Sequence, residues 1–292
     1  MGAVADRNLR DGAQGRVGAV FDRSFYVVLD GRWICFGPPA LGSGPLNALF
    51  APAARTLAIA AGQTCHVADG TLFADGFALV SRRSASVWRP AAPSWTIDTL
   101  DAGLNSFDGP RDSPVARDAL GLIDGPNASP ASAVLAAAAH RPALRLADGI
   151  RCALARDRET GTANFAGCEE LLGLGPGLTP SGDDVLGGAM VALAMLGCER
   201  QRDALWTTLR QHVPHRTTDI AGAHLAAAAD GLGAAALHDA LASILSGDAT
   251  ALPAALARLD TVGHSSGWDG LSGALLVMRI YRETTLDRLR AA

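Results

Sequence analysis

The residues with the clearest potential for chemistry form one glycine-rich stretch, residues 173–184 (GLGPGLTPSGDD), which we call the glycine segment. It leads directly into an apolar run that is predicted to be a helix. Free N–H groups at a helix N-terminus bind phosphate and carboxylate groups, because they donate hydrogen bonds and carry partial positive charge. The glycine segment therefore predicts an anion-binding loop. Its spacing does not match the G-x-G-x-x-G dinucleotide fingerprint.

A second stretch, residues 263–269 (GHSSGWD), has a similar composition, and we call it the histidine segment. When residues 181–189 are aligned with residues 266–274, six of the nine positions are identical. The sequence thus predicts two related loop-helix elements whose helix starts face one pocket.

In this interpretation, carboxyl groups and one imidazole do the chemistry and the loops around them bind the substrate. The candidate catalytic residues are Asp183, Asp184, Asp269 and His264. Asp183 and Asp184 are also candidate ligands of Mg²⁺, which prefers carboxylate oxygens. The candidate substrate-binding residues are Gly175, Gly177, Leu178, Thr179, Ser181, Gly182, Arg216, Thr217, Thr218, Ser265, Ser266 and Gly267.

A structural interpretation competes for some of these residues. Ser181 with Asp184, and Ser266 with Asp269, have the S-x-x-[DE] spacing of a capping box, which stabilises a helix start without any ligand. Capping does not account for Gly175 and Gly177 of the glycine segment, or for the carboxylate of Asp183 beside Asp184. Both interpretations stay open on the sequence alone.

Two further loops have a similar double interpretation. Residues 216–218 (RTT) precede a predicted helix, where they could bind an anion or supply a plain N-cap at Thr217 or Thr218. Residues 42–47 (GSGPLN) form a tight loop between predicted strands. This loop could act as a lid or be simply a turn.

The composition excludes several mechanisms and partners. The chain has no lysine, and its 25 basic side chains other than histidine are all arginine. A P-loop nucleotide site and a pyridoxal phosphate enzyme both need lysine, so neither is expected. The net charge of −4 provides no basic surface for nucleic acid. No apolar run reaches the ~20 residues that span a bilayer, so no membrane partner is expected.

The cysteines indicate a reducing location. They are odd in number, widely spaced and without a C-x-x-C pair, which fits neither a disulfide framework nor a zinc ribbon. We therefore expect buried free thiols in a cytoplasmic protein. The five are Cys35, Cys65, Cys152, Cys168 and Cys198.

The elements that must position these residues indicate an α+β fold. An antiparallel β-rich domain, a sheet or small barrel, is expected over residues 1–113, with a Pro/Gly-rich linker from about residue 90. An all-helical domain is expected over 114–292. Strands are predicted at 16–29, 32–36, 56–61, 64–67, 71–80 and 85–88. Helices are predicted from 129–130 and at 142–157, 163–173, 183–197, 199–213, 218–230, 234–246, 251–261 and 269–281.

The glycine segment resembles the signature of the AllH-like family. Residues 42–47, residues 216–218 and the histidine segment resemble further parts of that pattern, in the same order. The matching motif positions are Gly175, Gly177, Thr179, Ser181, Asp183, Asp184, Ser266 and Asp269.

The resemblance implies a link to oxamate carbamoyltransferase, in which a subunit of this type works with two other proteins. That enzyme belongs to anaerobic purine (allantoin) degradation and cleaves oxalurate with phosphate to give oxamate and carbamoyl phosphate. The expected function is therefore a subunit or paralogue of such a transferase that binds a small anionic nitrogen metabolite. The alternatives are a non-catalytic ligand-binding or scaffolding subunit, and a Mg²⁺-dependent hydrolase that uses Asp183, Asp184 and Asp269.

Overall fold

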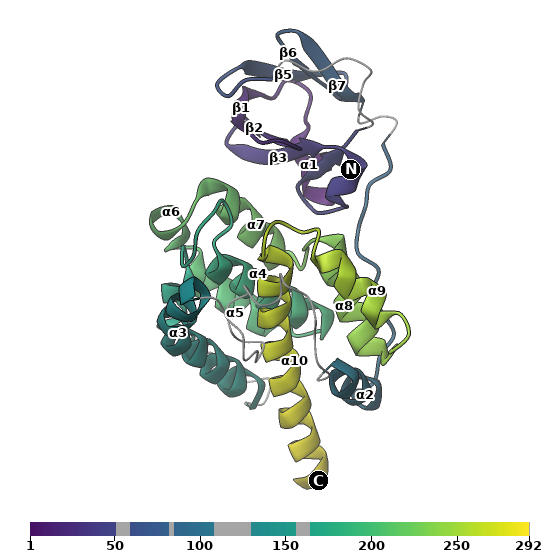
Figure 1. The fold of residues 1–292 in the computed structure, drawn as a ribbon, viewed down its shortest axis with the longest axis vertical. Coiled ribbons are helices and arrows are strands. Elements are labelled where there is room, and N and C mark those ends of the chain that lie inside the picture. The colour runs from purple at the N-terminus through teal and green to yellow at the C-terminus, as the bar shows by residue number, and fades with distance from the viewer. Residues whose placement is uncertain (51–58, 82–84, 108–129, 156–163, 292) are drawn as a thin grey trace. The chain divides into compact units, whose positions relative to one another are not determined.

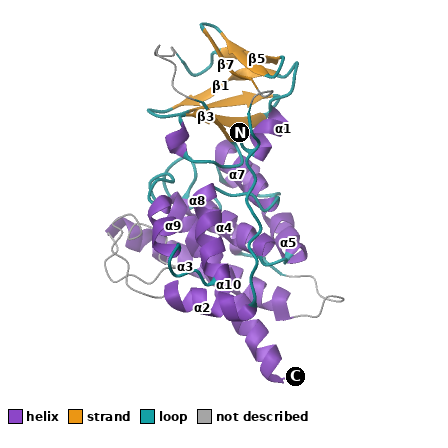
Figure 2. Cartoon of the chain, turned by 90° about the vertical axis from the view of Figure 1, so that its right-hand side faces the viewer, coloured by secondary structure: helices purple, strands orange, loops and turns teal. Residues whose placement is uncertain are grey.

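The computed structural model describes residues 1–50, 59–81, 85–107, 130–155 and 164–291, which form two compact units, Met1–Pro90 and Ala91–Ala292. The first unit is β-rich and the second is helical, as the sequence predicts (Figures 1 and 2). The predicted boundary between residues 113 and 114 lies outside the described residues and stays a prediction.

The first unit is one seven-stranded sheet with a short helix, α1 (Ala3–Asn8), and a 3-10 turn, η1 (Pro39–Leu41). Its strand order is β4-β3-β2-β1-β5-β6-β7, and all neighbours are antiparallel except β3 and β4. The strands are β1 (Gln14–Val20), β2 (Phe25–Leu29), β3 (Arg32–Gly37), β4 (Asn47–Leu49), β5 (Thr64–Ala68), β6 (Thr71–Ala74) and β7 (Phe77–Ser81).

The sheet curls around its own apolar core. Phe25, Val27 and Leu29 alternate along β2 with half-buried residues, so one face of the strand is buried. The rings of Phe25 and Phe77 lie 6.0 Å apart, although β2 and β7 are not neighbours in the sheet. The edge strand β7 is therefore folded back toward β2, so that the sheet curls like half of a barrel.

Several strand predictions need correction. The predicted strands 16–29 and 71–80 are each divided into two strands by a turn, and 85–88 contains only an isolated bridge at Trp88. Most of the predicted strand 56–61 lies outside the described residues. The short elements α1 and β4 were missed, because three to six residues carry too little periodicity to be recognised.

The second unit is a helical bundle around one large core. Its helices are α2 (Ile97–Phe107), α3 (Pro130–Ala155), α4 (Ser181–Met195), α5 (Glu199–Leu209), α6 (Val213–Arg216), α7 (Asp219–Ala229), α8 (Ala235–Ser246), α9 (Leu252–Leu259) and α10 (Ser266–Ala291), with a 3-10 turn η4 (Cys168–Leu171). No helix in the described ranges combines the length and apolar character that crossing a bilayer needs.

Most predicted helices are confirmed, but α10 ends at Ala291 and not at the predicted residue 281, and three other regions differ. The predicted helix 163–173 is only the turn η4, because Gly167 and Gly173 have positive φ angles at its two ends. The two helices predicted before residue 157 form one continuous helix, α3, which includes Pro142. Helix α2 lies within the stretch predicted as a linker, and its buried Leu100 and Leu104 join the main core.

Four of the five cysteines are buried free thiols, as expected. Cys152, on α3, is exposed, which corrects the prediction for that residue. Burial raises the pKa of the Cys168 thiol to about 12, so this group stays protonated near neutral pH.

Candidate functional site

The glycine segment and the histidine segment meet at the adjacent N-termini of α4 and α10. The two hydroxyl oxygens Thr179 Oγ1 and Ser266 Oγ lie 3.1 Å apart, although these residues are 87 positions apart in the sequence. Helices α4 and α10 run side by side through the middle of the helical unit (Figures 1 and 2). The convergence that the sequence interpretation requires is therefore present.

Glycines allow the two helices to approach so closely. A Cβ atom on Gly188 would lie 1.8 Å from the carbonyl oxygen of Gly270, and one on Gly273 would lie 1.9 Å from that of Val185. In the alignment of the two repeated stretches, Gly188 corresponds to Gly273 and Val185 to Gly270. The contacts are thus reciprocal, which is what a local two-fold relation between the two elements produces.

The backbone of the glycine segment is bent by residues that only glycine suits. Gly173 has φ +74°, and a Cβ there would lie 1.9 Å from the carbonyl oxygen of Arg216; Gly175 has φ +120°. Among the described residues, no protein acceptor lies within hydrogen-bond distance of the N–H groups of Gly175, Gly177 and Leu178. These N–H groups are available to solvent or to a bound anion.

Asp183 fixes the glycine segment in place. Its Oδ1 accepts a hydrogen bond from the N–H of Gly173 at 3.2 Å, and its Oδ2 accepts one from the hydroxyl of Thr217 at 2.5 Å. The side chain is 3% exposed. Burial raises the pKa of Asp183 from 3.8 to about 6, although the two hydrogen bonds oppose this rise. Both oxygens have protein partners, so this geometry favours a positioning role, and its predicted catalytic role stays a prediction.

The raised pKa of Asp183 predicts a pH-dependent stability. The folded state holds this proton more tightly than the unfolded state, so the free energy of unfolding should fall by up to about 3 kcal/mol between pH 4 and pH 7 because of this group. The Asp183→Asn variant lacks the titration and should gain stability relative to the unchanged protein as the pH rises. Urea unfolding of both proteins across this range measures the difference, and parallel curves would contradict the raised pKa.

Asp184 lies at the junction of the two segments. The residue is half-buried, but its Oδ2 atom is buried and has no hydrogen-bond partner among the described residues. The pKa of Asp184 is raised well above its ordinary value, first by burial and then by the nearby carboxyl groups of Asp269 and Asp183. Hydrogen bonds from Ser266 and Thr179 oppose this rise only partly. Burial and the neighbouring carboxyl groups thus favour the protonated form of Asp184.

Asp269 is the counterpart of Asp184 on α10. It is fully buried, and its Oδ2 accepts a hydrogen bond from the hydroxyl of Ser265 at 2.8 Å. The indole N–H of its neighbour Trp268 donates to Asp260 Oδ1 at 2.7 Å, which ties the histidine segment to the end of α9. No sequence pattern indicated this second contact.

The predicted capping boxes are wrong in detail. The residue that caps α4 is Pro180, which makes no side-chain cap bond, and its carbonyl oxygen accepts from the N–H of Asp184. At α10 the carbonyl oxygen of Ser265 accepts from the N–H groups of Trp268 and Asp269. Each cap lies one residue before the predicted serine, so Ser266 is left beside Thr179 rather than used in a cap.

The remaining candidates are divided between anchoring and exposed positions. Thr218 is the N-cap of α7, as one alternative predicted, and its hydroxyl also donates to the carbonyl oxygen of Leu178 at 2.5 Å. Arg216 and His264 are exposed. Ser181, Gly182 and Gly267 are buried; a Cβ on either glycine would lie within 2.5 Å of a backbone carbonyl oxygen. Both glycines therefore serve close packing.

The loop at residues 42–47 is a closed turn in the first unit, in which the side-chain N–H of Asn47 donates to the carbonyl oxygen of Gly42 at 2.9 Å.

Across the described residues, no group of three or more His, Cys, Asp or Glu side chains is placed to hold a metal ion. The predicted magnesium site and the hydrolase alternative that depends on it gain no support.

Comparison with known proteins bears on the helical unit. Residues 171–278 match the family model described as oxamate carbamoyltransferase subunit AllH. No curated protein and no solved structure matches the chain. The match includes the glycine segment, residues 216–218 and the histidine segment, whereas residues 42–47 lie outside it. The family resemblance inferred from the sequence is thereby confirmed for residues 171–278, the part of the chain that carries the candidate site, whereas for residues 42–47 it stays a prediction.

Proposed function

We propose that this chain is a subunit or paralogue of an oxamate carbamoyltransferase-type enzyme, and that it binds a small anionic nitrogen metabolite where the glycine and histidine segments meet. Both segments lie within the residues that match the AllH family. The observation that carries the proposal is the buried Oδ2 atom of Asp184, which lacks a hydrogen-bond partner among the described residues at this junction.

The charges of the site suit an anion. A carboxylate would repel a phosphate or a second carboxylate, and the raised pKa of Asp184 shifts this group toward its uncharged form. The N–H groups of Gly175, Gly177 and Leu178 have no protein acceptor within the described ranges, and they precede the N-terminus of α4. Preorganised N–H donors of this kind stabilise anionic groups and the negative charge that develops during acyl or carbamoyl transfer.

The nitrogen of the metabolite has its own recognition element in this proposal. A buried polar atom without a partner is costly, and a ligand that supplies the missing hydrogen bond recovers this cost. The Oδ2 atom of Asp184 accepts a hydrogen bond from an amide or carbamoyl N–H group, while the loop N–H groups hold the anionic end of the same molecule. Thr179 and Ser266 orient the Asp184 carboxyl group.

Calorimetric titration of the purified chain with oxamate, carbamoyl phosphate and inorganic phosphate tests the proposal. The Asp184→Asn variant keeps the shape of the side chain but can present an NH₂ group where Oδ2 was. We expect the dissociation constant for oxamate to rise about 10- to 100-fold. Inorganic phosphate has no N–H group, so its binding should weaken less.

The matched control is Asp219→Asn, the same chemical change at an exposed carboxyl group in the first turn of α7. It should change each dissociation constant by less than about twofold. Absence of binding by all three ligands, or equal losses in the two variants, would contradict the proposed site.

A further inference from the structure

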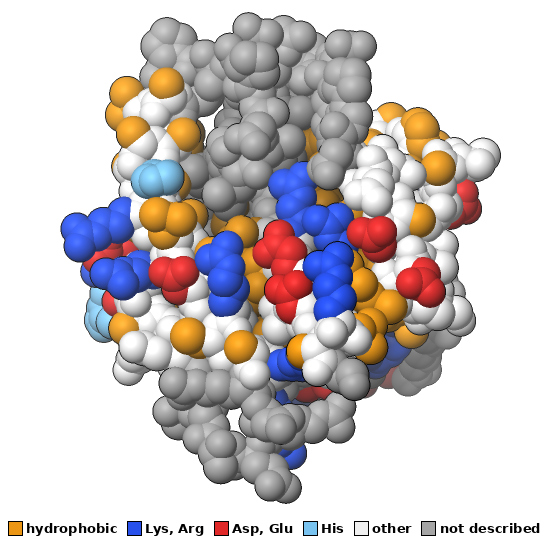
Figure 3. Space-filling view, turned by 90° about the horizontal axis from the view of Figure 1, so that it is seen from below, with side chains coloured by type: hydrophobic (Ala, Val, Ile, Leu, Met, Phe, Trp, Pro, Cys, Tyr) orange, Lys and Arg blue, Asp and Glu red, His pale blue; other side chains and the backbone are white. Residues whose placement is uncertain are grey.

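The opposite end of α10 forms one wall of a groove that the proposed function does not use. The groove has a volume of about 490 Å³, and its other wall is α2. Figure 3 shows arginine and acidic side chains close together on the face seen from below. The residues that line the groove are Asp101, Asn105, Arg282, Glu283, Leu286, Asp287 and Arg290.

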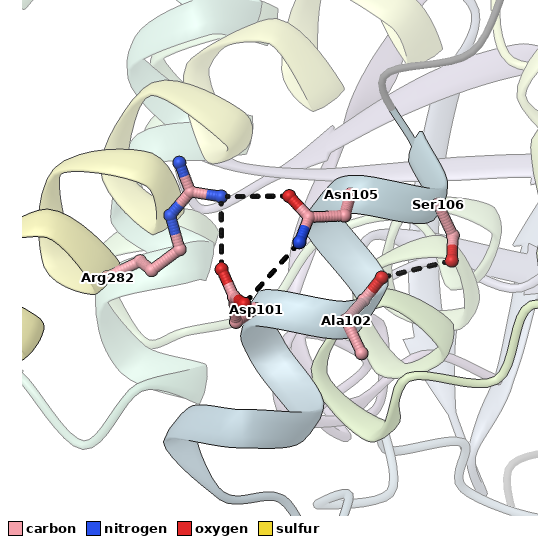
Figure 4. A network of polar contacts seen from close by, with 5 residues as sticks. All are labelled: Asp101, Ala102, Asn105, Ser106 and Arg282. Carbon is pink, nitrogen blue, oxygen red and sulfur yellow. Dashed lines mark hydrogen bonds and ion pairs between the residues drawn. The ribbon is translucent and has the colours of Figure 1, made fainter.

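One arginine of this groove is already held by α2. The guanidinium of Arg282 lies 3.4 Å from Asp101 Oδ1 and donates to Asn105 Oδ1 at 3.4 Å, while the amide of Asn105 donates to Asp101 Oδ2 (Figure 4). This network fixes α10 against α2. The other charged residues of α10 that line the groove, which we call the outer residues, are not part of this network and can contact another partner. They are Glu283, Asp287 and Arg290.

The outer residues carry both signs of charge, because Glu283 and Asp287 are acidic and Arg290 is basic. In the described part of the chain Glu283 has no ion-pair partner, and Arg290 pairs only with Asp287, at 3.5 Å with both side chains about three-quarters exposed. Leu289 is 61% exposed. Small-molecule sites are mostly apolar, whereas Leu286 is the only apolar residue among those that line this groove. The surface therefore suits a protein partner better than a small ligand.

The arrangement of these charges fits a second copy of the same helix. Glu283 and Arg290 are equally far from the midpoint between Leu286 and Asp287, so two copies that run antiparallel about this midpoint place each glutamate opposite an arginine. We propose that this face of α10 binds a second copy of the chain in a two-fold arrangement, with Glu283 paired to Arg290 of the partner subunit. A two-fold interface uses the same surface on both copies, and this stretch is complementary to itself.

The interface is small and partly ionic, which determines how it should behave. The last turns of α10 extend beyond the other helices of the unit (Figures 1 and 2), and one helix end offers less than the ~800 Å² per partner of a typical stable interface. The dimer should therefore form only at high protein concentration, and it should weaken as salt is added.

Sedimentation equilibrium over a range of protein concentrations tests the proposal. The unchanged chain should show a monomer–dimer equilibrium, while Glu283→Arg and Arg290→Glu should each remain monomeric because like charges meet at both contacts. When the two variants are mixed, both contacts again join opposite charges, so the dimer should return. This rescue in trans is specific to the proposed pairing.

The control is Arg141→Glu, a charge reversal at an exposed position within α3. It should dimerise like the unchanged chain. Circular dichroism of each variant confirms that its helical content is retained. A monomer at every concentration, dimerisation unchanged by the single reversals, or a mixture that stays monomeric would overturn the proposal.

Discussion

The Gly188→Ala variant is expected to lose about 3 kcal/mol or more of unfolding free energy and to lose ligand binding at the junction. The added Cβ would lie 1.8 Å from the carbonyl oxygen of Gly270, a distance that no rotamer change can relieve because the backbone fixes the Cβ position and the oxygen is itself a backbone atom. Helices α4 and α10 must then separate, and Thr179 moves away from Ser266. Urea unfolding and calorimetric titration with oxamate measure the two losses.

Gly187 provides the matched control for this variant. It is the preceding residue of the same helix, and a Cβ there would meet only the Cβ of Ala228, at 3.8 Å, which is an ordinary contact. Because alanine is a better helix former than glycine, Gly187→Ala should be neutral or stabilise the chain by about 0.5–1 kcal/mol. Similar losses in both variants would show that the close approach of the two helices is not what makes Gly188 necessary.

The Asp183→Ala variant is expected to lose about 2–4 kcal/mol of unfolding free energy at pH 5, below the raised pKa of about 6. The change removes the acceptor of both the Gly173 N–H and the Thr217 hydroxyl, and it leaves a small void around them. At pH 7 the loss should be smaller, because the unchanged protein then also bears the cost of a buried charge. Urea unfolding at the two pH values measures both effects.

Asp183→Asn distinguishes the hydrogen bonds from the charge. The amide oxygen still accepts from the Gly173 N–H, and the amide nitrogen can donate to the oxygen of Thr217, so we expect this variant to stay close to the unchanged protein at pH 5. A large loss of unfolding free energy in Asp183→Asn at pH 5 would contradict this account. It would mean that these two hydrogen bonds alone do not explain how the carboxyl group stabilises the site.

The fold was predictable where local signals were strong and long. Long apolar runs gave α4 and α8 within about two residues, and Thr218 marked the start of α7 correctly. The stretch 163–173 looked helical by composition, but positive φ angles at Gly167 and Gly173 reduce it to one short turn. Composition alone does not tell whether a glycine lies inside a helix or ends it.

The candidate site was predictable in its location but not in its internal contacts. The repeated Ser-Gly-x-Asp pattern placed Asp184 and Asp269 at two helix starts, and both are there. The pattern could not show that the hydroxyl of Thr217 would donate a hydrogen bond to Asp183. This hydrogen bond depends on how the chain turns before α7, and that turn has no periodicity that could be read from the sequence. Adjacent aspartates with the same predicted role therefore have different environments, one fully hydrogen-bonded and one with an unpartnered oxygen.

The reciprocal glycine contacts of α4 and α10 restrict how this protein can diversify. Each helix fills the space that a side chain of the other would need, so neither Gly188 nor Gly273 can be enlarged while the other helix keeps its place. If the proposed ligand site is correct, changes in ligand preference are expected in the loops ahead of the two helices and not at these glycines. The paired helices then act as a rigid frame that holds the two loops at a fixed separation.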